Sequence, residues 1–236
     1  MSDDFGPGKD LVGAIIVAAG NSQRMGGLDK LYVSMQGRPL LTFALETFVS
    51  SRIINQIVLV TDPAVLNATT ALVQEIGYSD SVKVCPGGPR RQDSVRLGLR
   101  SLNNCAWVIV HDGARPCVDP GLIEIGLEAA QATGAAVPGI PLGDTVKFVD
   151  SEGRVQRTLE RDKLWSIQTP QIFRRELLEE AHNSIVDSVT DDASMVEKMG
   201  HVVKVFPGSH KNIKITWPSD LMIVQAILQG ELEEKV

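Results

Sequence analysis

Five short apolar runs rich in β-branched residues recur along the first part of the chain and predict β-strands. They cover residues 13–19, 56–61, 82–85, 107–111 and 135–142. Between these runs, apolar residues recur at spacings of three and four, which predicts amphipathic helices. The helical stretches cover residues 40–49, 64–77, 94–102 and 119–133. This alternation of strands and helices is typical of an α/β protein.

The apolarity within the predicted strands is continuous rather than alternating, as in GAIIVAA at 13–19. A strand of this kind is covered on both faces, so we expect a mostly parallel, twisted, Rossmann-like sheet flanked by helices. Ligands of such sheets bind beyond the carboxyl ends of the strands. Three loops in that position are rich in Gly, Arg or Asp: AGNSQRMGGLDK at 19–30, CPGGPRRQDS at 85–94 and HDGARP at 111–116.

The pattern changes between about residues 141 and 169, where short β-prone pieces flank the turn sequence DSEG at 150–153. This segment predicts a β-hairpin arm that leaves the main sheet. The remaining elements are helices at 174–186 and 191–199, strands at 202–206 and 212–216, and a helix that begins near Pro218. We expect a single domain over residues 1–236, with a disordered N-terminus at 1–11.

Composition and charge narrow the classes of function. The 236 residues carry a formal net charge of -6, which argues against a nucleic-acid-binding protein because such proteins display a basic face. No apolar run approaches the roughly 20 residues that span a bilayer. The N-terminal stretch MSDDFGPGKD is too polar for a signal sequence. We therefore expect a cytoplasmic protein without a membrane segment.

The first loop combines glycines with two cations, Arg24 and Lys30. Its spacing is neither that of a P-loop nor that of the dinucleotide fingerprint. Gly20 lets the backbone approach a triphosphate closely, and Arg24 and Lys30 supply the positive charge that such a ligand requires. The alternative is a surface turn with two solvated cations.

The second loop places Gly87 and Gly88 ahead of a helix whose expected first residues are Asp93 and Ser94. Free backbone N–H groups at a helix start can bind a base, a ribose or a phosphate. The alternative is a glycine turn followed by an ordinary helix cap, for which Asp and Ser are the usual residues.

The third loop carries a carboxylate and a guanidinium within four positions, on Asp112 and Arg115. Asp112 is a candidate to hold a hard cation such as Mg²⁺, directly or through water, with phosphates completing the shell. The alternative is a structural ion pair between Asp112 and Arg115.

Other polar residues lie at the ends of predicted strands or on the arm, and each by itself is more typical of a solvated or capping residue. They are Asp144, Thr145, Lys147, Arg161, Thr190, Asp191, Asp192 and Lys214. The sequence has no G-x-S-x-G elbow and no H-E-x-x-H motif, so it lacks the signals of covalent hydrolysis and of zinc chemistry.

Taken together, the loops resemble one family. The motifs that carry the resemblance are AAGNSQRM with Lys30, PGGPRRQDSVRLGL, VHDGARP, PLGDTVK, QTPQIF, TDDASMVE and NIKIT, in this order over nearly the whole chain. This order is that of the 2-C-methyl-D-erythritol 4-phosphate cytidylyltransferases. The resemblance implies a nucleotide-diphospho-sugar transferase fold and transfer of a cytidylyl group from CTP to methylerythritol phosphate, with Mg²⁺, releasing pyrophosphate.

The resemblance also implies roles for single residues. Arg24 and Lys30 match the cations that stabilise the α-phosphate, and Arg161 and Lys214 match those that hold the methylerythritol phosphate. The CTP-binding positions it implies are Ala18, Ala19, Gly20, Asn21, Gly87, Gly88, Ser94, Asp112 and Ala114. The substrate-binding positions are Arg115, Asp144, Thr145, Arg161, Thr190 and Lys214. Mg²⁺ is expected to bind mainly through substrate phosphates, with Asp112 as its candidate protein ligand.

The family forms homodimers that exchange their arms, so the resemblance places Thr145, Arg115 and Arg161 at the neighbouring subunit's site. One departure is Pro89, where many relatives have a polar or acidic residue after the Gly-Gly pair. Two alternatives stay open: a ribitol 5-phosphate cytidylyltransferase, and a catalytically silent nucleotide-binding subunit with a regulatory role.

Overall fold

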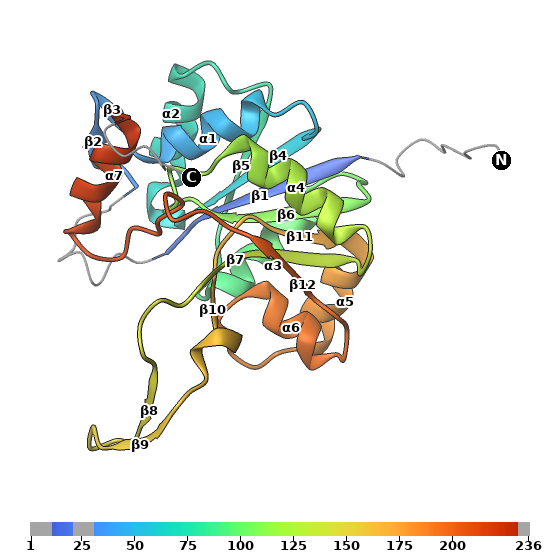
Figure 1. Cartoon of the computed structure of the whole chain (residues 1–236). Coiled ribbons are helices and arrows are strands. Elements are labelled where there is room, and N and C mark those ends of the chain that lie inside the picture. Colours follow the sequence, from blue (N-terminus) through green and yellow to red (C-terminus); the bar gives the residue numbers. More distant parts are fainter. Residues whose placement is uncertain (1–10, 21–30, 231–236) are drawn as a thin grey trace.

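The computed structural model of the protein describes residues 11–20 and 31–230 and shows a twisted sheet with helices on both faces (Figure 1). The strands of this sheet are β1 Val12–Ala18, β4 Gln56–Thr61, β5 Val82–Pro86, β6 Trp107–Asp112, β7 Ala135–Pro141, β10 Trp165–Ile167, β11 Gln171–Arg174 and β12 Lys204–Pro207. They form an 8-stranded sheet in the order β10-β7-β11-β6-β1-β4-β5, with β12 paired to β7. Strand β1 is parallel to β4 and β6, β4 to β5, and β12 to β7, which confirms the predicted mostly parallel sheet.

The helices cover the two faces of the sheet in two groups (Figure 1). On one face lie α1 Leu41–Ser50, α2 Leu66–Glu75 and α4 Pro120–Ala130. On the other lie α3 Arg91–Ser101, α5 Arg175–Ser184 and α6 Asp192–Lys198. A seventh, α7 Asp220–Leu228, packs through Val224 on a smaller cluster around Phe43. Short 3-10 turns occur at η2 Pro63–Val65 and η3 Arg161–Lys163.

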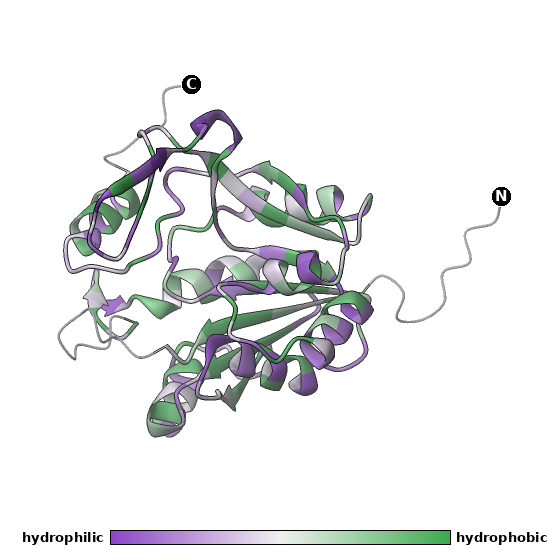
Figure 2. Cartoon of the chain, turned by 90° about the horizontal axis from the view of Figure 1, so that it is seen from below, coloured by the Kyte–Doolittle hydropathy of each residue, from purple (hydrophilic) through white to green (hydrophobic). Residues whose placement is uncertain are grey.

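Strand β1 explains why a continuous apolar run is needed at the centre of this sheet. Ala14 and Ile16 pack in the core on the α1 face, whereas Ile15, between them, packs in the core on the α3 face. All three side chains are fully buried. Because neighbouring residues of a strand point to opposite faces, a strand covered on both sides has no position left for a polar residue. Figure 2 shows the central strands mostly in the green of hydrophobic residues.

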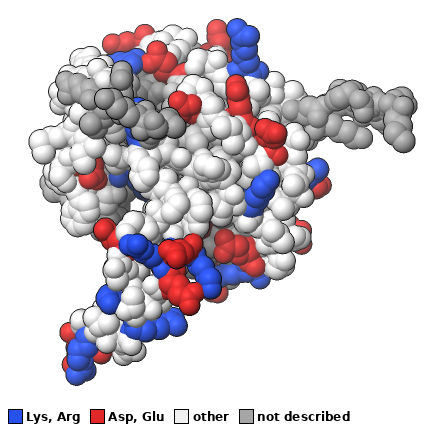
Figure 3. Space-filling model, in the orientation of Figure 1, with Lys and Arg blue, Asp and Glu red and all other residues white. Residues whose placement is uncertain are grey.

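The predicted hairpin arm is confirmed. Strands β8 Lys147–Val149 and β9 Val155–Thr158 pair antiparallel around a turn in which the Asp150 carboxylate accepts hydrogen bonds from the backbone of Glu152 and Arg154. Gly153 has a positive φ of 78°, a conformation that favours glycine. The arm projects away from the sheet, and charges of both signs crowd its tip (Figures 1 and 3). Residues 165–167, predicted as part of the arm, return to the main sheet as β10.

Three local predictions were wrong or incomplete. Residues 212–216 do not form a strand, because Ile215 makes a backbone bond to Ala114 O outside any ladder and Asn212 is held by side-chain bonds. Helix α3 begins at Arg91 rather than at Asp93, since the chain turns helical directly after the extended residue Arg90. The antiparallel strand β11 and a small hairpin, β2 Ser34–Met35 with β3 Arg38–Pro39, were not predicted.

Candidate functional site

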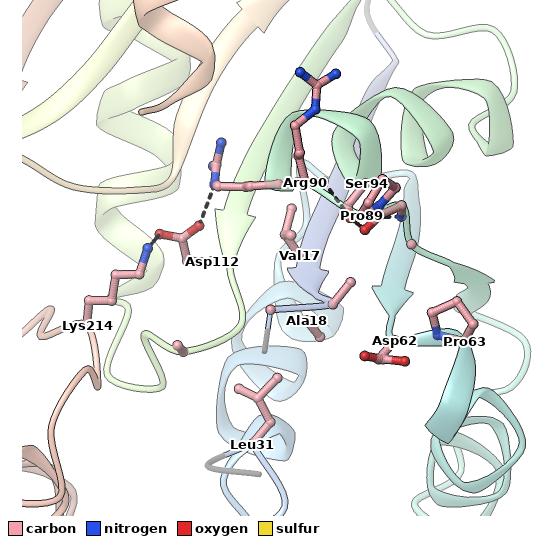
Figure 4. A pocket seen from close by; sticks show the side chains of 16 residues that line it. Val17, Ala18, Leu31, Asp62, Pro63, Pro89, Arg90, Ser94, Asp112 and Lys214 are labelled. Carbon is pink, nitrogen blue, oxygen red and sulfur yellow. Dashed lines mark hydrogen bonds and ion pairs between the residues drawn. The ribbon is translucent and has the colours of Figure 1, made fainter. Parts of the chain in front are cut away.

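A cavity of about 690 Å³ lies at the carboxyl ends of β1, β4, β5 and β6, beside the first turn of α3 (Figure 4). This is where a parallel sheet of this kind binds ligands. Its lining residues are Val17, Ala18, Ala19, Gly20, Leu31, Asp62, Pro63, Gly87, Gly88, Pro89, Arg90, Arg91, Ser94, Asp112, Ala114 and Lys214. Apolar and small residues thus form one part of the cavity wall, and cations with one buried carboxylate form another.

The glycine loop after β5 is shaped by contacts that leave no room for side chains. A Cβ atom on Gly87 would lie 2.4 Å from Ala19 Cβ, and one on Gly88 would lie 2.6 Å from Asp93 Cβ. The backbone N–H of Gly87 donates to Thr61 O at 2.7 Å, and that of Gly88 donates to Ser94 Oγ at 3.1 Å. These two N–H groups are therefore used within the protein, and Ser94 fixes the loop instead of leaving its N–H groups free for a ligand.

Asp112 lies at the centre of a cationic cluster. Its Oδ1 accepts a hydrogen bond from Arg91 Nε at 3.0 Å and its Oδ2 one from Lys214 Nζ at 2.8 Å (Figure 4). Arg115 Nε lies 3.8 Å from Oδ2. Burial alone would raise the pKa of Asp112, but the charges of Arg91, Lys214 and Arg115 outweigh it and hold the pKa well below its ordinary value. Asp112 is therefore ionised, and three cations share one negative charge.

Arg91 connects this cluster to a second buried carboxylate. Its Nη1 donates to Asp192 Oδ2 at 2.6 Å, and Asp192 Oδ1 lies 3.1 Å from His182 Nε2. Asp192 is fully buried, and its pKa lies below the ordinary value because Arg91 and His182 outweigh the effect of burial. The sequence motifs RRQDS and TDDAS contain these residues, but no local pattern indicates that they meet across 101 positions.

Arg115 turns away from the cavity. Its guanidinium is buried and donates to the backbone oxygen of Asn212 at 2.7 Å. The structural ion pair with Asp112, the alternative that the sequence left open, is therefore what the described residues show. Arg115 is not among the residues that line the cavity.

His111 is buried directly behind Asp112 in a site that fits the neutral imidazole. Its Nδ1 lies 3.1 Å from Thr169 Oγ1 and its Nε2 lies 3.1 Å from the backbone oxygen of Arg115, so the Nε2–H tautomer donates to the oxygen and Nδ1 accepts from the hydroxyl. Burial lowers the pKa of His111 to about 4.

We expect this histidine to make folding stability depend on pH. A histidine in the unfolded chain has a pKa of about 6.5, so as the pH falls toward 4 the unfolded state takes up a proton that the folded state does not. The free energy of unfolding should fall by roughly 3 kcal/mol over this interval. Urea unfolding of the wild type and of His111→Gln at several pH values measures this slope. The exposed His201 provides the control variant His201→Gln; a wild-type slope in His111→Gln would contradict the assignment.

The sequence-predicted residues divide into three groups. Those that line the cavity are Ala18, Ala19, Gly20, Gly87, Gly88, Ser94, Asp112, Ala114 and Lys214. Those that lie elsewhere are Arg115, Asp144, Thr145, Arg161 and Thr190, of which the last four are exposed. Arg161 donates to Gly143 O at 2.7 Å at the base of the arm. Arg24, Lys30 and Asn21 lie outside the described residues, as does the N-terminal stretch 1–10.

The described residues do not form a Mg²⁺ site by themselves. Both oxygens of Asp112 are already bonded to cations, and Asp62, the other acidic residue of the cavity wall, uses Oδ1 to accept from the backbone of Ala64. Within residues 11–20 and 31–230, no group of three or more potential ligands of the His, Cys, Asp and Glu types could hold a metal ion. The role of Asp112 as a contact of Mg²⁺, directly or through water, therefore stays a prediction.

No helix within the described residues is long and apolar enough to cross a membrane.

Comparison with known proteins gives the same family throughout. Residues 12–230 match the family model described as IspD, 2-C-methyl-D-erythritol 4-phosphate cytidylyltransferase. The enzyme of that name from Dehalococcoides mccartyi is 47% identical over 218 residues, which covers 92% of this chain and 96% of the relative. The one from Pelotomaculum thermopropionicum is 41% identical over 95% of this chain and 98% of its own.

Solved structures agree with the sequence relatives. A 4-diphosphocytidyl-2C-methyl-D-erythritol synthase from Anaerococcus prevotii superposes with a TM-score of 0.83 at 30% identity, covering 94% of this chain and 97% of the other. A 2-C-methyl-D-erythritol 4-phosphate cytidylyltransferase from Thermus thermophilus gives a TM-score of 0.75 at 31% identity, covering 91% and 98%.

Proposed function

The chain belongs to the 2-C-methyl-D-erythritol 4-phosphate cytidylyltransferase (IspD) family, and we propose that the cavity beyond β1, β5 and β6 is where it carries out that family's reaction. The protein is a nucleotidyltransferase of non-mevalonate isoprenoid biosynthesis. It transfers the cytidylyl group of CTP to 2-C-methyl-D-erythritol 4-phosphate and releases pyrophosphate. The product is 4-diphosphocytidyl-2-C-methyl-D-erythritol.

The observation that carries the proposal is the composition of the cavity wall. Ala18, Ala19, Gly87 and Gly88 form a surface without long side chains, on which a planar base and a ribose can lie closely. Lys214 and Arg91 line the same cavity and bond to Asp112. One part of the cavity therefore suits the cytosine nucleoside, and another suits phosphate groups.

The chemistry requires positioning and positive charge rather than a protein nucleophile. A phosphate oxygen of the methylerythritol phosphate attacks the α-phosphorus of CTP, a new P–O bond forms, and the bond to the β-phosphate oxygen breaks as pyrophosphate leaves. The attacking phosphate is already ionised near neutral pH, since its second pKa is about 6. Two anionic groups must approach each other, so cations that offset their repulsion provide much of the catalysis. We propose this role for Arg24, Lys30 and Lys214.

The acceptor is tested by incubating the purified protein with CTP, Mg²⁺ and one of two acceptors while pyrophosphate is measured. We expect release with 2-C-methyl-D-erythritol 4-phosphate and little with ribitol 5-phosphate. Faster release with ribitol 5-phosphate would assign the chain the alternative substrate. Tight CTP binding without release with either acceptor would favour a silent nucleotide-binding subunit.

We propose that Mg²⁺ reaches the site on the phosphates of CTP and supplies further positive charge there, because both oxygens of Asp112 already accept hydrogen bonds from cations. CTP and the sugar phosphate are multiply charged and do not cross a bilayer unaided, which supports a cytoplasmic location. Asp144, Thr145 and Thr190 stay predicted substrate contacts.

We further propose that the chain is a homodimer that exchanges its arms. Trp165, Ile167 and Val205 are partly exposed, and their side chains gather around Gly139, within 3.1 to 3.3 Å of the point where its Cβ would lie. Phe148 and Val155 on the arm are also exposed. Exposed apolar residues on a sheet edge and on a projecting arm are typical of an interface between identical chains. An exchanged arm would bring Arg161 to the cavity of the neighbouring subunit.

Arg161→Ala is expected mainly to raise the KM for the sugar phosphate, by roughly tenfold or more, because the lost guanidinium contacts that substrate and not CTP. Steady-state kinetics with each substrate varied in turn measures this split, and Arg157→Ala on the same arm is the matched control. A rise confined to the KM for CTP would show that Arg161 acts on CTP and not on the sugar phosphate.

The same variant tests arm exchange. Arg161→Ala and Lys30→Ala proteins are mixed, their subunits are allowed to reassort, and activity is measured at low sugar phosphate. If the arm acts on the neighbouring subunit, a mixed dimer contains one site with both wild-type residues, and activity rises above that of either variant alone. No rise after verified reassortment would show that Arg161 acts within its own chain.

A further inference from the structure

We propose that Asp192, a buried side chain outside the cavity wall, is a positioning residue for the transfer reaction. In this proposal Asp192 fixes the guanidinium of Arg91, and Arg91 in turn fixes Asp112 together with Lys214. The inference rests on the proposed binding of CTP and the sugar phosphate in the cavity beside these residues.

The contacts of Asp192 point to Arg91 rather than to its own helix. Helix α6 is capped by the preceding residue, Asp191, whose Oδ1 accepts from the backbone N–H of Ser194 at 3.1 Å. Asp192 is the first residue of the helix, and its carboxylate bonds to Arg91 Nη1 and to His182 Nε2. The Oδ2 of Asp191 accepts from Gln171 Nε2 at 2.7 Å. The two adjacent aspartates therefore have different partners, and only Asp192 bonds to Arg91 on α3.

Arg91 holds two carboxylates with one rigid group. Its Nη1 donates to Asp192 at 2.6 Å and its Nε donates to Asp112 at 3.0 Å. A guanidinium is planar, so two such bonds fix its plane and its position. The third nitrogen, Nη2, is buried and has no hydrogen-bond partner among the described residues. An unpartnered donor is costly to bury, so its presence beside the cavity indicates that this guanidinium is held for more than its own stability.

The arrangement transmits position from α6 to the reaction site. Asp112 is bonded by Arg91 on one oxygen and by Lys214 on the other, and both Asp112 and Lys214 line the cavity. If the Asp192 carboxylate were lost, Asp112 would be the one carboxylate still bonded to Arg91. The Arg91 guanidinium would then be free to move together with Asp112 and would no longer hold Asp112 in place. The cations around the reacting phosphates would then lose their fixed geometry, and small displacements of such groups lower turnover strongly.

A purely structural role for Asp192 is the competing explanation, because a buried arginine needs a counter-charge. The two explanations differ in one respect. A structural residue changes the folded fraction and the melting temperature, whereas a positioning residue also changes kcat in the fully folded protein, and does so only while Arg91 can join both carboxylates.

The test is a double-mutant cycle of Asp192→Asn and Arg91→Lys, with kcat, both KM values and the melting temperature measured for each protein. Asp192→Asn keeps the size of the side chain and removes its charge. Arg91→Lys keeps a positive charge near Asp192 but cannot hold two carboxylates in one plane. The neighbouring variant Asp191→Asn is the matched control, because it removes a carboxylate that caps α6 without contacting Arg91.

We expect Asp192→Asn to lower kcat by roughly 10- to 100-fold in folded protein while the KM values change less. In the Arg91→Lys background the same substitution should lower kcat by less than about threefold, because the path through Arg91 is already broken. Asp191→Asn should lower the melting temperature and leave kcat within about twofold of the wild type, since a lost helix cap affects stability.

The proposal is overturned if folded Asp192→Asn retains wild-type kcat, or if it lowers kcat by the same factor in both backgrounds. Should Asp192→Asn not fold, Arg91→Lys alone decides, since wild-type kcat in that variant would show that joining the two carboxylates is unnecessary. Wild-type protein assayed in parallel separates the two levels of inference: if it releases no pyrophosphate from CTP and the sugar phosphate, the proposed reaction fails, not the positioning by Asp192.

Discussion

Replacing Asp112 with asparagine is expected to lower both the stability of the protein and its turnover. The substitution leaves Arg91, Arg115 and Lys214 around a neutral side chain, and buried charges that lose their partner cost about 3–5 kcal/mol. The Lys214 side chain is 42% exposed, so solvent screens its share, and most of the loss should come from the two arginines. For a chain of this size, the melting temperature should fall by roughly 10 °C.

The loss should depend on pH and on ligand in defined directions. Because the pKa of Asp112 is lowered in the folded state, its contribution is complete above the unfolded value of about 3.9 and is lost as the pH falls below it. The wild type and Asp112→Asn should therefore differ most near neutral pH and converge in strong acid. CTP should raise the melting temperature of Asp112→Asn more than that of the wild type, since its phosphates supply the missing negative charge.

Thermal unfolding monitored by fluorescence, with and without CTP, measures these effects, and pyrophosphate release at equal folded fraction measures turnover. Asp93→Asn provides a matched control, because Asp93 pairs with the exposed Arg90 and ion pairs on the surface contribute little to stability. If Asp112→Asn melted within about two degrees of the wild type, the change expected of the control, the three cations would not depend on this carboxylate.

The central strands were predictable because a strand that is buried on both faces requires a continuous run of apolar residues. The run at 13–19 corresponds to β1 Val12–Ala18, and QIVLVT at 56–61 is β4. The segment at 212–216 has the same β-prone composition, yet it is not a strand. Composition reports that a residue suits a pleated surface, whereas a strand also requires a neighbouring edge with free backbone groups, and that depends on the rest of the fold.

The cavity was predictable to the extent that it is built by loops at strand ends. Gly87, Gly88 and Asp112 stand directly after buried strands or at their ends, so topology alone brings them together. The direction of a long side chain is different, because it follows from contacts that the local sequence does not contain. Arg115 seemed to emerge with Asp112 into a ligand site, but its guanidinium is buried against the backbone of Asn212.

The pairing of Arg91 with Asp192 is a second side-chain contact that the local sequence does not predict. RRQDS looked like a helix start and TDDAS like a helix cap, and both descriptions are locally correct. Their pairing, across 101 positions, is made by the packing of α3 against α5 and of α5 against α6. Single-sequence patterns report spacings of up to a few residues, so a contact of this kind has no local signal.

Lys30→Ala is expected to lower turnover by on the order of a hundredfold or more, the typical loss when a charge contact made in the transition state is removed. Lys30 lies outside the described residues, but the described chain on both sides of its loop, at Gly20 and at Leu31, lines the cavity. The described residues on either side of 21–30 therefore both lie at the proposed site of the triphosphate.

The substitution should lower kcat more than it raises the KM for CTP. Lys30 is proposed to stabilise the charge around the α-phosphorus in the transition state, and a contact that is stronger there than with bound CTP contributes to kcat. Lys30→Arg retains the charge and should recover part of the turnover. Lys83→Ala removes an exposed lysine that bonds to Ser101 O and is not among the residues that line the cavity, so it should leave the kinetics unchanged. Unchanged turnover in Lys30→Ala would remove this lysine from the mechanism and leave Lys214 and Arg24 as the cations that must offset the repulsion between the two phosphates.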